Sequence, residues 1–376
     1  MRVSKLPTTI VAIGAALLLT AACGSGSTDG GAGPDTSPEA LATVQAEYDK
    51  AIDVGSLELP MPSEPVDPGS RRVAIISVGS NSTSGVLLHS LLLRAVKDIG
   101  WDYDEFDGQL NLSAVGNYIQ QAVQRDYDAI IYTAYAAESL KAPIQAALDA
   151  GVPVAGFLST PDEFGDRLIT TNDDQVEAGE RAAQAMIVNS EGKAKIQVFY
   201  DKAFVNNVER AESAEAYVKK HCSGCQIDMQ EVNTADLAQP GPPYLNAFIS
   251  THPKGTVTDI LTTTDSHTDV FMKSLAQAGR TDIRLNGFDG IPFGIEGMTE
   301  SKYNVPALTS QAWLYQAYGL FDQLARKLAK QPLWSGLDAV PVGLIDKTNV
   351  DGFDTDGTFP GSDKYIDGFL TLWGKK

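Results

Sequence analysis

Polar but uncharged residues recur directly after the apolar runs of this sequence. The clearest segments are 80–84 (SNSTS), 133–135 (TAY), 158–160 (LST), 204–207 (FVNN) and 262–265 (TTTD). Hydroxyl, amide and carboxylate groups hydrogen-bond a polyhydroxylated ligand, and aromatic rings cover its apolar ring face. None of these segments carries Lys or Arg, which a phosphate ligand would require. The pattern favours a neutral ligand, although each residue taken alone is equally suited to capping a following helix.

The apolar runs before these segments predict buried strands, and the stretches between them have helical spacing. Strands are expected at 73–78, 129–132, 152–157, 196–200, 258–262 and 283–288. Helices are expected at 39–52, 86–99, 112–125, 137–150, 176–187, 208–220 and 268–278. This alternation predicts parallel βαβ units, and because the rhythm restarts near residue 195, two α/β lobes are expected. Ligands of such sheets bind at the carboxyl ends of the strands, where the polar segments lie.

The composition excludes some partners. The 376 residues include 48 Asp plus Glu and 29 Lys plus Arg, a net charge of −19. Nucleic acid and anionic lipid are both bound through clustered basic residues. We therefore expect neither to be a direct partner.

The N-terminus predicts export. Residues 1–22 combine Arg2 and Lys5 with an apolar stretch and small residues, as a secretory signal peptide does. The apolar stretch is too short to span a bilayer of about 30 Å. Thr20-Ala21-Ala22-Cys23 resembles a bacterial lipobox, which implies that Cys23 is lipidated and holds the mature chain on the outer side of the cell membrane. Ordinary secretion, with Cys23 unmodified, is the alternative.

Two segments near the N-terminus have linker composition. Residues 24–38 are rich in Gly, Ser, Asp and Pro, and residues 57–70 are rich in Pro. We therefore expect the compact fold to begin at Arg71.

The sequence contains few motifs that are typical of a catalytic or metal site. Cys222 and Cys225 form a C-x-x-C pair, for which a structural disulfide is expected outside the membrane; redox catalysis or half of a zinc site are the alternatives. No G-x-S-x-G or H-E-x-x-H motif occurs. Residues 354–357 (DTDG) lack the rest of a calcium loop and are interpreted as a solvated turn. We expect no enzyme activity, cofactor or metal.

From about Arg71 to Asn349 the chain resembles the type I periplasmic binding proteins of ABC importers, in the ribose-binding group. The residues that carry the resemblance are 126–131 (DYDAII), 147–154 (ALDAGVPV), 171–173 (TND), 286–290 (NGFDG) and 309–311 (TSQ). It implies an α/β fold of two doubly wound parallel-sheet lobes joined by a three-segment hinge, which close on ligand. Lobe one is expected at 71–170 and 312–340, and lobe two at 171–311 and 341–376, after a signal peptide (1–22) and a linker segment (23–70).

The resemblance also implies site residues, among them hydroxyl contacts at Asp289 and Gln311. With the strand ends included, the predicted ligand-binding residues are Asn81, Ser82, Thr83, Tyr135, Ser159, Thr160, Asn207, Arg210, Asp265, Phe288, Asp289, Gln311 and Trp313. Two departures stand out: Thr83-Ser84 replaces an adjacent aromatic pair, and Leu158-Ser159 replaces an Asp-Arg pair. Without that ion pair we expect a modified sugar, a less hydroxylated polyol or an aromatic metabolite rather than a simple sugar.

The resemblance therefore implies a monomeric, lipid-tethered receptor that delivers a sugar-like molecule to an ABC permease. A sensory receptor of the same fold, which reports occupancy to a membrane kinase, is the alternative.

Overall fold

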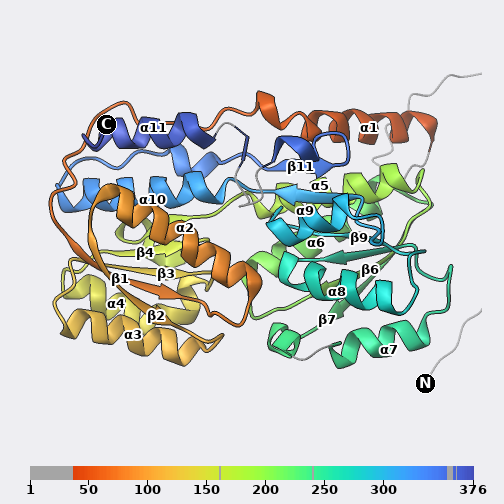
Figure 1. Cartoon of the computed structure of the whole chain (residues 1–376), viewed down its shortest axis with the longest axis horizontal. Coiled ribbons are helices and arrows are strands. Elements are labelled where there is room, and N and C mark those ends of the chain that lie inside the picture. The colour runs from red at the N-terminus through yellow and green to blue at the C-terminus, as the bar shows by residue number, and fades with distance from the viewer. Residues whose placement is uncertain (1–36, 161, 239–240, 354–358, 361) are drawn as a thin grey trace, which may run out of the picture. The chain divides into compact units, whose positions relative to one another are not determined.

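The computed structural model describes residues 37–160, 162–238, 241–353, 359–360 and 362–376. Within these ranges the chain forms two α/β lobes, each built on a parallel sheet flanked by helices (Figure 1). This is the architecture that the alternation of apolar strands and helical segments predicts. Across the described ranges no helix is long and apolar enough to cross a membrane.

Lobe one is built on a five-stranded parallel sheet. In spatial order its strands are β2 (Asp102–Asp107), β1 (Arg72–Ser77), β3 (Ala129–Thr133), β4 (Val154–Phe157) and β5 (Ile169–Thr171). Its helices are α2 (Thr83–Ile99), α3 (Leu112–Gln124), α4 (Lys141–Asp149) and α10 (Trp313–Leu328). Strand β3 is buried at every residue because helices cover both faces of the sheet, and its sequence is accordingly a continuous apolar run.

Lobe two is built on a four-stranded parallel sheet. In spatial order its strands are β7 (Gln226–Glu231), β6 (Lys195–Tyr200), β8 (Asp259–Thr262) and β9 (Arg284–Asn286). A bridge between Gly287 and Leu308 links this sheet to an antiparallel pair, β10 (Ala307–Ser310) and β11 (Gly343–Asp346). Its helices are α5 (Gln175–Asn189), α6 (Val205–His221), α7 (Pro243–Thr251), α8 (Asp265–Gln277) and α9 (Pro292–Thr299).

The strands β2 and β7 are absent from the sequence-based prediction because they lie at the edges of their sheets. Their sequences are DYDEFD and QIDMQE, and neither contains a fully buried residue. Edge strands commonly carry charge that discourages pairing with other chains, so they lack the apolar run that marks a central strand. Periodicity also leaves unpredicted the short strands β5, β10 and β11 and the helices α7, α9, α10 and α11 (Ser362–Leu372).

The chain passes between the lobes more often than a three-segment hinge requires. Residues 172–174, 311–312 and 340–342 connect elements of opposite lobes and form the hinge. Two further passages lie outside it. One leads from β11 to α11, which packs on α10 over lobe one rather than on lobe two, where the predicted division would place it (Figure 1). The other is at the N-terminus.

The N-terminal segment is part of the compact fold, so the expectation that the fold begins at Arg71 is wrong. Helix α1 (Pro38–Ile52) begins at the N-cap Ser37 and lies over lobe two (Figure 1). It buries Val44, Tyr48 and Ala51, and the Tyr48 hydroxyl donates to Asp346 Oδ2 at 2.6 Å.

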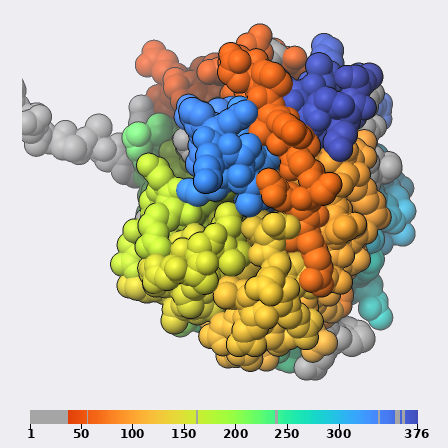
Figure 2. Space-filling model, turned by 90° about the vertical axis from the view of Figure 1, so that its left-hand side faces the viewer, coloured from red at the N-terminus to blue at the C-terminus, as the bar shows by residue number. Residues whose placement is uncertain are grey.

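The Pro-rich segment 57–70 is irregular, as its prolines require, but it is held against lobe one. Val66 is buried and its amide donates to the carbonyl of Leu372 at 3.0 Å. The indole Nε1 of Trp101 donates to the carbonyl of Pro68 at 3.2 Å. Figure 2 shows orange residues of this part of the chain lying across the face of lobe one, beside the blue C-terminal elements. We call α1 and residues 53–70 the N-terminal arm.

Candidate functional site

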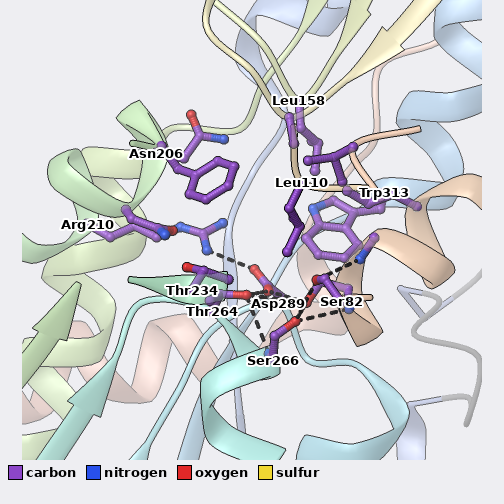
Figure 3. Close-up of a pocket in the computed structure, with 17 residues that line it drawn as sticks. Ser82, Leu110, Leu158, Asn206, Arg210, Thr234, Thr264, Ser266, Asp289 and Trp313 are labelled. Carbon is purple, nitrogen blue, oxygen red and sulfur yellow. Dashed lines mark hydrogen bonds and ion pairs between the residues drawn. The ribbon is translucent and has the colours of Figure 1, made fainter. Parts of the chain in front are cut away.

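The carboxyl ends of the strands in the two sheets face one another, and a cavity of about 80 Å³ lies between them (Figure 3). We call this space the cleft cavity. Lobe one lines it with Val78, Ser82, Ser84, Gly85, Leu88, Leu110, Ala134, Leu158 and Trp313. Lobe two lines it with Phe204, Asn206, Asn207, Arg210, Thr234, Thr264, Ser266 and Asp289.

Arg210, on α6, is the centre of the lobe-two wall. Its side chain is 4% exposed, and its Nη1 lies 2.8 Å from Oδ1 of Asp289, which is 2% exposed. The guanidinium also donates to the Thr263 carbonyl at 2.7 Å, to Gln175 Oε1 at 2.6 Å and to Gln311 Oε1 at 2.9 Å. A buried charge is stable only when it is paired and hydrogen-bonded, and these partners meet that condition.

Asp289 is held from its other side by lobe two as well. Its backbone is in the left-handed region, with φ of +80°, and its Oδ2 accepts from Thr264 Oγ1 and from the amide of Asp265, both at 3.2 Å. Asp265, predicted as a ligand contact, is fully buried outside the cavity lining, and its Oδ2 accepts from the Ile291 amide at 3.1 Å. Burial and the nearby charge of Asp289 raise the pKa of Asp265 well above its ordinary value.

One glycine makes this arrangement possible. A Cβ at Gly287 would lie 2.6 Å from Asp265 Oδ1 and 2.4 Å from Thr268 Oγ1. A larger residue at this position would therefore displace the buried side chains of Asp265 and Thr268, so Gly287 lets the loop after β9 pack closely against the start of α8.

Hydroxyl groups join the two lobes at one edge of the cavity. Ser266 Oγ of lobe two lies 3.0 Å from Ser82 Oγ and 3.2 Å from Thr83 Oγ1, and it accepts from the Ser84 amide at 3.1 Å. Ser84 Oγ also lies 3.3 Å from Thr264 Oγ1. We call these five residues the hydroxyl latch. The lobes are thus in direct contact, in a closed arrangement.

Two latch residues also cap helices, as the alternative interpretation of polar residues after strands expects. Ser82 Oγ accepts from the Gly85 amide at 3.2 Å and caps α2. Thr264 Oγ1 accepts from the Ser266 amide at 3.4 Å and caps α8. The same side chains therefore cap a helix and line the cavity, because the N-termini of both helices point at the cleft.

The site is connected to the hinge by side-chain hydrogen bonds. Gln311 Oε1 accepts from Arg210 Nη2 and also from Trp313 Nε1, the latter at 2.8 Å. Near the first hinge passage, Gln316 Nε2 donates to Asp173 Oδ1. Burial raises the pKa of Asp173 to about 7. A movement of the hinge therefore changes the surroundings of Arg210 directly.

The structure brings part of the predicted set to the cleft cavity. The predicted residues that line it are Ser82, Asn207, Arg210, Asp289 and Trp313. That they contact a ligand stays a prediction.

The other predicted residues surround the cavity without lining it. Phe288 lies under the guanidinium of Arg210, 4.8 Å from ring centroid to Cζ, and Tyr135 stacks on Phe204 at 5.6 Å between ring centroids. Ser159 is fully buried and lies 2.8 Å from the Tyr132 hydroxyl. Of the remaining residues, Thr83 belongs to the latch, Gln311 supports Arg210, Asn81 is exposed, and Thr160 borders a separate hollow beside the hinge.

The lining residues absent from the predicted set are of two kinds, polar and apolar. Thr264 stands in a polar segment after a strand, as predicted ligand contacts do, and Ser266 follows two residues later. Leu110, Ala134 and Leu158 stand shortly after β2, β3 and β4, but their apolar side chains do not match the polar pattern that predicts ligand contacts. Their position at the carboxyl ends of the strands is the signal that identifies them.

The remaining sequence motifs lie away from the cleft. Cys222 and Cys225 form a disulfide at the end of α6. In the described part of the chain, no group of three His, Cys, Asp or Glu residues is placed to hold a metal ion. The predicted turn at 354–357, the signal peptide and Cys23 lie outside the described residues.

The chain is similar to known proteins in sequence and in fold. Residues 88–332 match the family model of the periplasmic binding protein domain. No curated protein matches the sequence significantly.

Among solved structures, a sugar ABC transporter protein from Yersinia enterocolitica superposes with a TM-score of 0.71 at 20% identity, covering 82% of this chain and 95% of that chain. A 5-methylthioribose transporter solute-binding protein from Thermotoga lettingae, in complex with 5-methylthioribose, gives 0.69 at 16% identity, with 84% and 100% covered. A carbohydrate transporter protein from Acidothermus cellulolyticus, in complex with myo-inositol, gives 0.63 at 19% identity, with 75% and 96% covered.

These matches agree with the architecture. The family model covers most of the chain, including α10 and, apart from β1, the strands that end at the cleft cavity. The two lobes and their hinge are those of the type I fold. The chain belongs to the periplasmic binding protein family.

Proposed function

We propose that the chain is the extracytoplasmic solute-binding lipoprotein of an ABC importer, and that it captures a small sugar-like molecule between its lobes. The observation that carries the proposal is the cleft cavity, where the buried Arg210–Asp289 pair lies at the carboxyl edge of lobe two. Family membership supports the role of solute binding. The complexes of similar fold with 5-methylthioribose and myo-inositol support a sugar-like or polyol ligand.

The chemistry of binding follows from the hydrogen bonds already made. Arg210 has five N–H donors, of which four have partners among the described residues, so one remains for a ligand hydroxyl. Asn207 adds an amide at the same wall, and the indole ring of Trp313 covers an apolar ligand face. The protein's own residues hold the solute without changing it, and the closed form is what the permease recognises.

The proposed function also requires that the protein stay attached to the membrane. Cys23 carries the lipid that keeps the receptor, a monomer, at the outer side of the membrane beside its permease. Cells that express the chain and receive an alkyne-labelled fatty acid should incorporate the label into the parent protein. The Cys23→Ala variant should be unlabelled and absent from the membrane fraction. A parent protein without label would contradict the anchor while leaving the binding proposal intact.

The ligand class is tested by a thermal-shift screen of sugars, polyols, nucleosides and aromatic acids. A ligand present at 100 times its Kd stabilises the folded protein by about 2.7 kcal/mol. Recovery of the bound compound unchanged after incubation separates a receptor from an enzyme. If nucleosides or aromatic acids stabilise the protein and sugars and polyols do not, the proposed ligand class is wrong.

The position of the site is tested with a matched pair of asparagine substitutions. Asn207→Ala removes a buried lining amide, so the affinity for the hit should fall by about tenfold or more. Asn246→Ala makes the same change at an exposed position on α7 and should leave the affinity unchanged. Equal affinities of the two variants would place the ligand elsewhere.

A further inference from the structure

The two walls of the cleft cavity differ in chemistry. Lobe one presents mainly aliphatic side chains, which are Val78, Leu88, Leu110, Ala134 and Leu158. It also presents hydroxyls from Ser82 and Ser84, but these are already hydrogen-bonded across the cleft in the latch. The only N–H of the Trp313 side chain is likewise used, by Gln311. The lobe-one wall therefore offers a ligand almost exclusively carbon surface.

Lobe two presents the opposite wall. Asn206 Oδ1 and Thr234 Oγ1 are buried and have no hydrogen-bond partner among the described residues, and both residues line the cavity (Figure 3). Arg210 and Asp289 lie beside them. Native proteins seldom bury polar atoms unpaired, because such atoms lose their hydrogen bonds to water. Hydroxyl groups of a ligand at this wall would supply the missing partners.

The aliphatic wall is placed at a cost in backbone energy. Leu110, Ala134 and Leu158 have φ of +55°, +68° and +54°, in the left-handed region that residues with a Cβ disfavour. Each follows a strand of lobe one and lines the cavity. Glycine or asparagine adopts this conformation more readily, so nothing in the backbone favours leucine there. Strained residues cluster where a site needs a particular side chain in a particular place.

We propose that the ligand is amphipathic: a small sugar or polyol that carries an alkyl or comparable apolar group at one end. Its hydroxyls face Asn206, Arg210 and Thr234 of lobe two, and its apolar end packs against Leu110 and Leu158 of lobe one. This inference rests on the proposed function, because it specifies the ligand of the same site. It also accounts for the Leu158-Ser159 segment, since a charged pair in that place would have to be desolvated against the apolar end of the ligand.

The inference is tested by titration calorimetry of the whole chain with two series of compounds. One consists of pentoses and pentitols, and the other of the same compounds with a methyl, ethyl or propyl ether at one end. Each buried methylene should tighten binding by about fourfold until the cavity is filled. If no member of either series binds, the proposed function fails. If the unsubstituted compounds bind as tightly as their ethers, the proposed function stands and the amphipathic ligand is wrong.

A substitution assigns the preference to the lobe-one wall. Asparagine accepts the left-handed backbone, so Leu110→Asn, at a half-buried position, exchanges the apolar surface for a polar one without new strain. The preference for the ether, measured as the ratio of the Kd values of the unsubstituted polyol and its ether, should fall by about tenfold. Leu333→Asn makes the same exchange at an exposed position and should change neither affinity.

Leu158→Asn repeats the test at the second leucine, with the melting temperature of the free protein measured alongside. If both Leu110→Asn and Leu158→Asn keep the parent's preference for the ether, the assignment of the apolar end to lobe one is wrong.

Discussion

Replacing Asp289 by asparagine should destabilise the protein far more than a single surface charge would. Asparagine is close in shape to aspartate and tolerates the left-handed backbone at this position, where φ is +80°. The substitution therefore removes the charge with little change in packing. It leaves the guanidinium of Arg210, 4% exposed, buried without its counter-ion.

The magnitude follows from the burial of both partners. Removal of one partner of a buried ion pair costs about 3–5 kcal/mol. Unfolding entropy is about 2.1 cal/mol/K per residue, so the 376 residues give a total near 0.8 kcal/mol/K. The melting temperature of Asp289→Asn, measured by scanning calorimetry without ligand, should fall by about 4–6 °C.

A double-mutant cycle decides whether the ion pair is the cause. Arg210→Met alone should cost a similar amount, because it leaves the carboxylate of Asp289 buried and unpaired. The double variant should lose clearly less than the sum of the two losses. Asp149→Asn breaks the exposed pair with Arg167 and should leave the melting temperature unchanged. If the stability loss of the double variant equals the sum of the two single losses within about 0.5 kcal/mol, the ion pair is not the cause.

Three further predictions concern the rest of the structure. Burial raises the pKa of Asp173 from 3.8 to about 7, so between these pH values the folded state holds a proton that the unfolded state has lost, and the stability of the parent falls as pH rises from about 4 to 7. The melting temperature of Asp173→Asn should therefore rise relative to that of the parent across this range. A difference that stays constant with pH would exclude this titration. Val44→Asp places a charge on the buried face of α1 and should lower the melting temperature by about 2–4 °C, whereas Ala46→Asp, on the exposed face, should not. If the two variants have the same melting temperature, the buried face of α1 does not contribute to stability. The Cys222→Ser/Cys225→Ser variant loses the cross-link of a short loop and should unfold about 2–3 °C earlier, and an unchanged melting temperature would show that the disulfide contributes nothing.

The sequence predicts the central strands because helices cover both faces of each sheet. Strand β3 reads AIIYT and strand β8 reads DILT, and all their residues are buried. The edge strands β2 and β7 carry no such signature, because solvent accepts their polar side chains. Edge strands are defined by their neighbours in space, which periodicity along the chain does not encode.

The candidate site, too, can be predicted from the sequence only in part. Polar residues such as Asn207 and Asp289 are recognisable because they follow strands of a parallel sheet. The pairing of Arg210 with Asp289 joins positions far apart in the chain, and only the fold brings them together. Leu110 and Leu158 are ordinary leucines in the sequence, and what marks them is a backbone angle that the sequence does not display.

The N-terminal arm sets a mechanical limit on the receptor. Helix α1 is fixed to lobe two through Tyr48, and the carbonyl of Pro60 accepts a hydrogen bond from the hydroxyl of Tyr315 in lobe one. The intervening residues 53–60 reach at most about 28 Å when fully extended. They connect the two lobes outside the hinge, so we infer that any opening that separates the two attachment points by more than this length must detach α1 from lobe two or Pro60 from Tyr315. The length of this connection would then set an upper limit on how far the lobes can open with the N-terminal arm in place.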